Sequence, residues 1–244
     1  MTDGLLLLHA WPLDARMWEP QLATLPDDLP TIAPNHPGFG GSEPAGEVMT
    51  MGASAERALA ELDRAGIDRA VVCGLSIGGY VAFELWRRAP ERFLGVVLAN
   101  TRAVADTPEG AAGRRELAER LRTEGNVLVA EPPALLAGDA PAGLQEHVRA
   151  LIADQTPEAI AAALLGMAER PDSTGDLSGI EVPALVVTST ADRLIAAEVS
   201  AGMADGIPGA RLEVIDGVGH LTNLEAPERF NALLLEHLAV CGLD

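Results

Sequence analysis

Short apolar runs alternate along most of the chain with longer stretches in which apolar residues recur at helical spacing. The runs predict six strands, over residues 4–9, 31–35, 70–75, 93–99, 183–188 and 211–215. The stretches between them predict helices over residues 17–25, 51–65, 77–88, 198–204 and 227–240. This alternation is typical of a parallel sheet covered by helices on both faces. We therefore expect an α/β fold with a mostly parallel sheet of about six strands.

Residues 101–177 break the alternation. The segment is rich in Ala, Leu, Glu and Arg, is interrupted by Pro and Gly, and contains no strand pattern. It predicts several short helices inserted after the fourth strand. Open α/β sheets bind ligands at the carboxyl ends of their strands. We therefore expect a core of residues 1–100 and 178–244, with residues 101–177 forming a helical lid. The alternative is that the segment only packs against one edge of the sheet.

A serine flanked by glycines lies between the third strand and the helix that follows it. Residues 74–79 read GLSIGG, which places Ser76 in a G-x-S-x-G nucleophile elbow. Gly74 and Gly78 remove the Cβ atoms that would clash at such a sharp turn. The helix begins next to the serine, so the backbone N–H of Ile77 is free to stabilise an oxyanion. The alternative is a structural turn with an incidental serine.

A serine hydroxyl needs a base to remove its proton, and the chain has five histidines. His220 lies in a glycine-rich loop directly after the last strand, from which its imidazole can reach over the serine. His147 and His237 lie in predicted helices, where solvent-exposed histidines are expected. His9 and His36 follow the first two strands, and we expect them to be structural or pocket-lining. The sequence therefore favours His220 as the base.

The base in turn needs an acid that fixes its tautomer. Asp192 follows the fifth strand and precedes His220 by 28 residues, enough for one helix and one strand. The chain order Ser…Asp…His is the order expected when a nucleophile elbow lies in a parallel α/β sheet. Asn100 occupies the rival position after the fourth strand and cannot carry the charge, and Asp216 is too close to His220 along the chain. Asp192 is thus the predicted acid; its alternative role is to cap the next helix.

Together with two further loops, the elbow and Gly219-His220 resemble the α/β-hydrolase family. The loops are HAWPLD over residues 9–14 and PGFGGS over residues 37–42. The resemblance covers nearly the whole chain and is weakest in the insertion. It implies that the backbone N–H of Trp11 is a second oxyanion donor beside that of Ile77. It also implies cofactor-free acyl transfer, and within the family the chain is similar to small esterases, enol-lactonases and perhydrolases.

The net charge of −19 argues against nucleic acid or an anionic membrane as a partner, since both need a basic face. It also disfavours highly anionic substrates, including acyl groups on acidic carrier proteins. All 17 basic residues are arginine, which excludes a Schiff-base lysine, a P-loop lysine and a Ser-Lys pair. Aromatic residues number only eight, so a pocket lined mostly by aliphatic side chains is expected.

The two cysteines make no disulfide framework, and no Cys/His cluster has metal-ligand spacing, so no metal site is predicted. The apolar run over residues 5–8 is too short to span a membrane. A secretory signal needs positive charge before its apolar run, whereas Asp3 precedes this one. We therefore expect a cytoplasmic protein. The pattern leaves the oligomeric state open.

These observations predict a serine hydrolase that cleaves carboxylic esters of small to medium, mostly apolar acyl groups through an acyl-serine intermediate. The substrate would be a small-molecule ester or lactone. A lactonase of the enol-lactone type, or a perhydrolase, would use the same triad of Ser76, Asp192 and His220. A different class of function is a ligand-binding protein that keeps the fold without turnover.

Overall fold

The computed structural model describes residues 1–243 and contains one six-stranded sheet in which every pair of neighbouring strands is parallel. The strands are β1 (Asp3–Leu8), β2 (Thr31–Ile32), β3 (Arg69–Leu75), β4 (Phe93–Ala99), β5 (Ala184–Ser189) and β6 (Arg211–Ile215). Their order across the sheet is β2-β1-β3-β4-β5-β6. Nearly every residue of β1, β3, β4 and β5 is buried, which explains their continuous apolar runs. The predicted sheet is confirmed.

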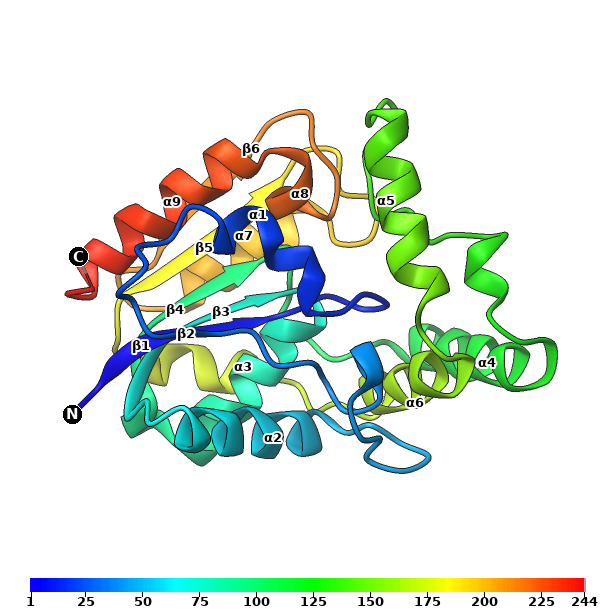
Figure 1. The fold of residues 1–244 in the computed structure, drawn as a ribbon, viewed down its shortest axis with the longest axis horizontal. Helices are drawn as coiled ribbons and strands as arrows, with labels where there is room; N and C mark the ends of the chain where they lie inside the picture. The colour runs from blue at the N-terminus through cyan, green and yellow to red at the C-terminus, as the bar shows by residue number, and fades with distance from the viewer. Residues whose placement is uncertain (244) are drawn as a thin grey trace.

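Helices cover both faces of this sheet, with α2 and α3 along one face and α1 and α9 along the other (Figure 1). The helices outside the segment between β4 and β5 are α1 (Glu19–Leu22), α2 (Met51–Arg64), α3 (Ile77–Arg88), α7 (Ala197–Gly206), α8 (Thr222–Glu225) and α9 (Pro227–Val240). None of the helices within residues 1–243 has both the length and the apolar character needed to cross a bilayer.

Two predicted elements are shorter than the pattern indicated. The strand expected over residues 31–35 pairs only through Thr31 and Ile32, since Pro34 has no N–H to donate to a ladder. The helix expected over residues 17–25 is a 3₁₀ turn, Ala15–Trp18, followed by the four-residue α1. Pro20 lies in the first turn of α1, a position where proline is tolerated.

The segment between β4 and β5 is helical. It contains α4 (Pro108–Glu124), α5 (Ala142–Ala153) and α6 (Pro157–Ala168), which lie beyond the carboxyl ends of the strands in Figure 1. Thr107 and Thr156 cap α4 and α6, each accepting a hydrogen bond from the N–H three residues on. The expected absence of strands over residues 101–177 is confirmed for this segment. The division into core and lid stays a prediction.

His237 corrects one prediction. Its side chain was expected on the solvent face of α9, but the residue is buried against the sheet beside Gly95 of β4. Burial lowers the pKa of His237 to about 4, so the imidazole is neutral at pH 7. The apolar spacing of α9 allowed this histidine on either face, and the packing of the helix on β4 decides it. His147 is exposed, as expected.

Candidate active site

Ser76 lies in a strained backbone conformation at the tip of the turn between β3 and α3. Its φ of 57° and ψ of −115° are rare for a residue with a side chain. A Cβ on Gly74 would lie 2.3 Å from the carbonyl oxygen of Gly78, and a Cβ on Gly78 would lie 2.2 Å from that of Leu8. The first glycine therefore allows the turn, and the second allows α3 to pack closely against β1.

The two predicted oxyanion donors lie on neighbouring elements. Ile77 is the first residue of α3, and Trp11 lies in the loop after β1. Neither backbone N–H donates a hydrogen bond to another of residues 1–243. The indole Nε1 of Trp11 donates to the carbonyl oxygen of Ile160 in α6, at 3.2 Å, which holds the loop in place. Both amides are thus free to bind a developing negative charge.

His220 and Asp192 form a buried hydrogen-bonded pair. The distance from His220 Nδ1 to Asp192 Oδ2 is 2.7 Å, and both side chains are shielded from solvent. Burial alone would raise the pKa of Asp192, but its hydrogen bond and charge interaction with His220 lower that pKa below its usual range. Because Nδ1 donates to the carboxylate, Nε2 of the neutral imidazole keeps a lone pair that can accept a proton.

The Asp192 carboxylate receives three further hydrogen bonds. Its Oδ1 accepts from the backbone N–H groups of Leu194, at 2.8 Å, and Ile195, at 3.0 Å. Its Oδ2 also accepts from Asn100 Nδ2, at 3.0 Å. Asp192 does not cap the next helix, because α7 begins only at Ala197. The carboxylate therefore stays ionised and fixed in orientation although it is buried.

A three-residue segment, residues 99–101, joins the serine to this pair. The N–H of Ser76 donates to the carbonyl oxygen of Ala99, at 2.9 Å, and Thr101 Oγ1 donates to the carbonyl oxygen of Ser76, at 2.8 Å. Between these two residues, Asn100 reaches Asp192. A Cβ on Gly79 would lie 2.4 Å from Thr101 Oγ1, so α3 also packs tightly on the segment.

Asn100 was rejected as the acid from the sequence, but in the structure it supports the carboxylate of Asp192, a role that its position was not expected to have. The signal was its position directly after β4, between the strands that precede Ser76 and Asp192. Its side chain is held by Ser189 Oγ, which accepts from Nδ2 at 2.9 Å, and by Thr222 Oγ1, which donates to Oδ1 at 2.8 Å. These bonds fix which end of the amide faces the carboxylate.

His9 and His36 form a second buried pair. The N–H of His36 donates to His9 Nε2, at 2.9 Å, and His36 Nε2 lies 3.0 Å from the carbonyl oxygen of His9. Burial lowers the pKa of His9 to about 4, so its ring is neutral at pH 7. The pair links the loops after β1 and β2, in agreement with a structural role. Within residues 1–243, no three His, Cys, Asp or Glu side chains are grouped as a metal site.

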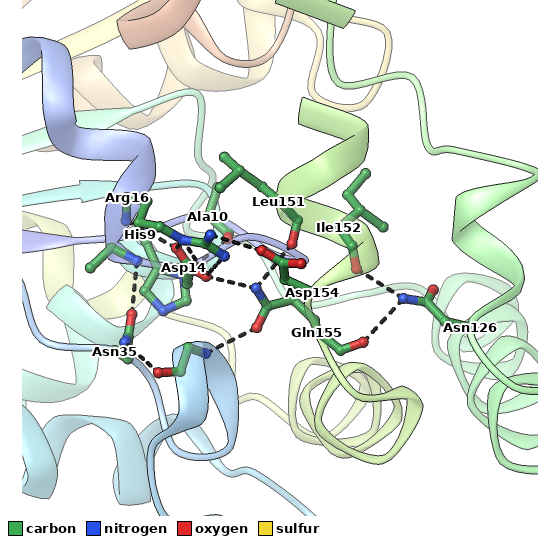
Figure 2. Close-up of polar contacts among 12 residues, drawn as sticks. His9, Ala10, Asp14, Arg16, Asn35, Asn126, Leu151, Ile152, Asp154 and Gln155 are labelled. Carbon is green, nitrogen blue, oxygen red and sulfur yellow. Dashed lines mark hydrogen bonds and ion pairs between the residues drawn. The ribbon is translucent and has the colours of Figure 1, made fainter. Parts of the chain in front are cut away.

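The end of α5 is tied to the loop that carries Trp11 (Figure 2). Gln155 Nε2 donates to Asp14 Oδ2, at 2.7 Å, and Gln155 Oε1 accepts from the N–H of Gly40, at 3.0 Å. Arg16 bridges Asp14 and Asp154, with Nη1 lying 2.8 Å from the latter carboxylate. The insertion is therefore anchored to two of the loops around the candidate site.

A second anchor holds the loop of His220. The carbonyl oxygen of Leu135, in the insertion, accepts from the N–H groups of His220 and Leu221, at 3.0 and 3.1 Å. The Glu225 carboxylate connects the same two segments, because it accepts hydrogen bonds from the N–H of Gly219 in the loop of His220 and from the N–H of Ala137 in the insertion, both at 2.9 Å. Burial, with smaller contributions from nearby aspartates, raises the pKa of Glu225.

If the chain hydrolyses esters as the sequence predicts, replacing Glu225 by glutamine is expected to lower kcat roughly 3- to 30-fold, with little change in KM. Both carboxylate oxygens accept hydrogen bonds, whereas an amide NH₂ would face one of the two N–H donors. The same variant is expected to lose about 1–2 kcal/mol of unfolding free energy. Steady-state kinetics and urea unfolding would measure both effects. Glu228→Gln, at an exposed position nearby, is the matched control. Equal kcat in the two variants would contradict a positioning role for Glu225.

A cavity of about 460 Å³ lies between the insertion and the loops that follow β1 and β5. Its size is that of a small-molecule site. Its apolar side chains are Trp11, Leu117, Leu128, Pro133, Leu164 and Leu194. Apart from Trp11 they are aliphatic, as the low aromatic content predicts.

Known proteins resemble the chain over nearly its whole length. The pimeloyl-[acyl-carrier protein] methyl ester esterase of Aromatoleum aromaticum is 31% identical, over 92% of this chain and 93% of that protein. The 3-oxoadipate enol-lactonase 1 of Acinetobacter baylyi is 29% identical, over 89% of this chain and 81% of that protein. The solved structure of a thermophilic esterase from Thermogutta terrifontis superposes with a TM-score of 0.93 and 38% identity, over 99% of this chain and 92% of that one.

The family model for the alpha/beta hydrolase family matches residues 5–233, which include every element of the sheet from β2 to β6 and most of β1. The match also spans the elbow at Ser76 and the loops of Asp192 and His220. This chain therefore belongs to the alpha/beta hydrolase family.

Proposed function

We propose that this chain is a carboxylic-ester hydrolase with Ser76 as nucleophile, His220 as general base and Asp192 as the acid that orients it. The observation that carries the proposal is the buried hydrogen bond between His220 and Asp192, attached through residues 99–101 to the strained turn of Ser76. A strained serine beside an ionised Asp-His pair is the arrangement that acyl transfer requires. The esterases among its relatives support the same reading.

The reaction begins when Ser76 Oγ attacks the ester carbonyl carbon and His220 Nε2 takes the hydroxyl proton. The N–H groups of Trp11 and Ile77 bind the oxyanion of the tetrahedral intermediate. The intermediate collapses, the C–O bond to the alcohol breaks, and His220 gives its proton to the departing alkoxide. Asp192 holds the imidazole by Nδ1 and stabilises its protonated form.

Water then completes the cycle. It attacks the acyl-serine carbonyl while His220 Nε2 takes its proton, and the second tetrahedral intermediate expels Ser76, which recovers the proton. The products are a carboxylic acid and the free enzyme. The same steps open a lactone, in which the leaving oxygen stays attached to the acyl chain. In this scheme residues 101–177 act as the lid that encloses the acyl group in the 460 Å³ cavity.

The proposal is tested by labelling with a fluorophosphonate, which phosphonylates an activated serine. The chain has no lysine, so trypsin releases Ser76 in the peptide of residues 70–87. One label is expected, on that peptide, and none on Ser76→Ala. A folded wild-type chain that takes up no label, or takes it up elsewhere, would rule out Ser76 as the nucleophile. That outcome would favour a binding protein that keeps the fold.

A further inference from the structure

Three arginines surround one buried carboxylate at the polar side of the cavity. Asp106, in the turn before α4, is 2% exposed at its side chain. Arg102 Nη2 and Arg114 Nε hydrogen bond its two oxygens, and Arg170 Nη1 lies 3.0 Å from Oδ1. Burial alone would raise the pKa of Asp106, but the guanidinium groups, first that of Arg114, lower it below its usual range. The cluster thus carries more positive charge than its one carboxylate can balance.

The three guanidinium groups are not equivalent. Arg170 is buried, lies 4.1 Å above the ring of Tyr80, and donates through Nη1 and Nη2 to the carbonyl oxygens of Met167 and Val104, so these two nitrogens serve the fold. Arg102 and Arg114 instead line the cavity. Arg114 Nη1 donates to Met167 Sδ, at 3.4 Å, whereas Arg102 Nη1 and Arg114 Nη2 have no hydrogen-bond partner among residues 1–243 and are not among the fully buried nitrogens. These two side chains therefore have binding capacity that Asp106 does not use.

The second acidic residue of the cavity does not neutralise them. Glu131 lies on the rim, where 67% of its side chain is exposed, and its carboxylate is 3.4 Å from Arg120. Screening by solvent makes such an exposed carboxylate a weak partner for a charge inside the cavity. The cavity lining holds Arg102 and Arg114 against Asp106 and Glu131, and buried Arg170 adds a third positive charge beside Asp106. This end of the cavity is therefore positive although the chain as a whole is acidic.

Three residues that line the cavity belong to loops that also carry parts of the proposed reaction centre. Trp11 carries one of the two proposed oxyanion donors, and Leu194 follows Asp192 by two residues. Arg102 directly follows Thr101, whose hydroxyl donates a hydrogen bond to the carbonyl oxygen of Ser76. All three loops follow parallel strands and so lie at one edge of the sheet. We therefore expect an ester whose carbonyl lies at Ser76 to extend into this cavity, in which Arg102 and Arg114 are the positively charged residues.

We propose that Arg102 and Arg114 bind a carboxylate of the substrate, so that preferred substrates are esters carrying a free carboxylate at the end of an apolar spacer. Paired guanidinium groups match a carboxylate in charge and geometry. The inference rests on the proposed esterase function for its kinetic test, and a binding test separates the two. Its substrate class is opposite to the expectation drawn from the net charge of the whole chain.

The kinetic test compares two esters of equal shape. The 4-nitrophenyl monoester of glutaric acid carries the carboxylate, and 4-nitrophenyl 5-methylhexanoate replaces it by an isopropyl group. Wild type is expected to prefer the first by kcat/KM, and Arg114→Gln is expected to lower that ratio ~10- to 100-fold. A second pair, 4-carboxyphenyl and 4-isopropylphenyl butyrate, shows whether the carboxylate belongs to the acyl or the alcohol part. The ratio does not depend on how much of the variant is folded.

The control is Arg115→Gln, which removes the same charge at an exposed neighbouring position of α4. It is expected to keep the wild-type ratio. Arg114→Lys, which keeps the charge beside Asp106, is expected to fall between wild type and Arg114→Gln. Preference for the neutral ester in both pairs, or an unchanged ratio in Arg114→Gln, would overturn the carboxylate site while leaving the esterase intact.

Calorimetric binding of free glutarate tests the site without turnover. Binding is expected to wild type and to Arg115→Gln, and to weaken ~10- to 100-fold in Arg114→Gln. Glutarate binding that depends on Arg114 in a chain that hydrolyses none of the esters would support the site and refute the esterase. Esterase activity without any glutarate binding, and with no preference for the carboxylate esters, would refute the site alone.

Discussion

Ser76→Ala is expected to hydrolyse 4-nitrophenyl butyrate about 10⁴- to 10⁶-fold more slowly than wild type. The variant keeps the oxyanion amides and the cavity but has no atom that can form the acyl intermediate. Initial rates at saturating ester, with the uncatalysed rate subtracted, measure the loss. Because alanine also has a Cβ, the strained turn should form as before, and the unfolding midpoint should stay close to that of wild type.

The control for this variant is Ser178→Ala, at an exposed position before β5. Its rate should match wild type. Residual activity of Ser76→Ala above a few per cent would show that another group attacks the carbonyl, and the proposed mechanism would then be wrong.

Asp192→Asn is expected to lower kcat about 10⁴-fold while leaving the fold intact. The backbone N–H groups of Leu194 and Ile195 both donate to Oδ1, so the amide oxygen of the variant must occupy that place. Its NH₂ group then faces His220 Nδ1, which can only accept, and the ring proton moves to Nε2. An imidazole in that tautomer cannot take the proton of Ser76.

The NH₂ group would also face Asn100 Nδ2, another donor, and Asn100 is held in place by Ser189 and Thr222. Asp216→Asn is the matched control, because Asp216 is exposed in the loop before His220 and bonds only Thr190 Oγ1 among the described residues. It is expected to keep wild-type kcat. A large loss in Asp216→Asn with normal turnover in Asp192→Asn would reverse the assignment of the acid.

The sequence pattern predicts the strands of the sheet well because the position and limits of each strand depend mainly on the residues within it. The limits of β4 and β6 match their apolar runs, and the elbow at Ser76 needs glycines that the sequence displays. The pairing of His220 with Asp192 follows from loops at one edge of a parallel sheet. These features rest on local spacing and chain order, which a sequence contains directly.

Other features depend on contacts between distant segments. The burial of His237 depends on which face of α9 packs against β4. The hydrogen bond from Asn100 to Asp192 joins two loops whose residues are 92 positions apart in the chain. The net charge of −19 gave no indication of the arginines around Asp106, because Arg102, Arg114 and Arg170 meet only after α4 and α6 pack. A sum over the chain does not describe the potential in one cavity.

The segment of residues 99–101 has a consequence for mutational scanning. Ala99 and Thr101 hydrogen bond the backbone of Ser76, and Asn100, between them, donates to the Asp192 carboxylate. Thr101 also packs against Gly79. A larger residue at position 79 must displace Thr101, and the displacement passes to both halves of the reaction centre. Screens for activity would therefore score this position as intolerant although it bears no reactive group.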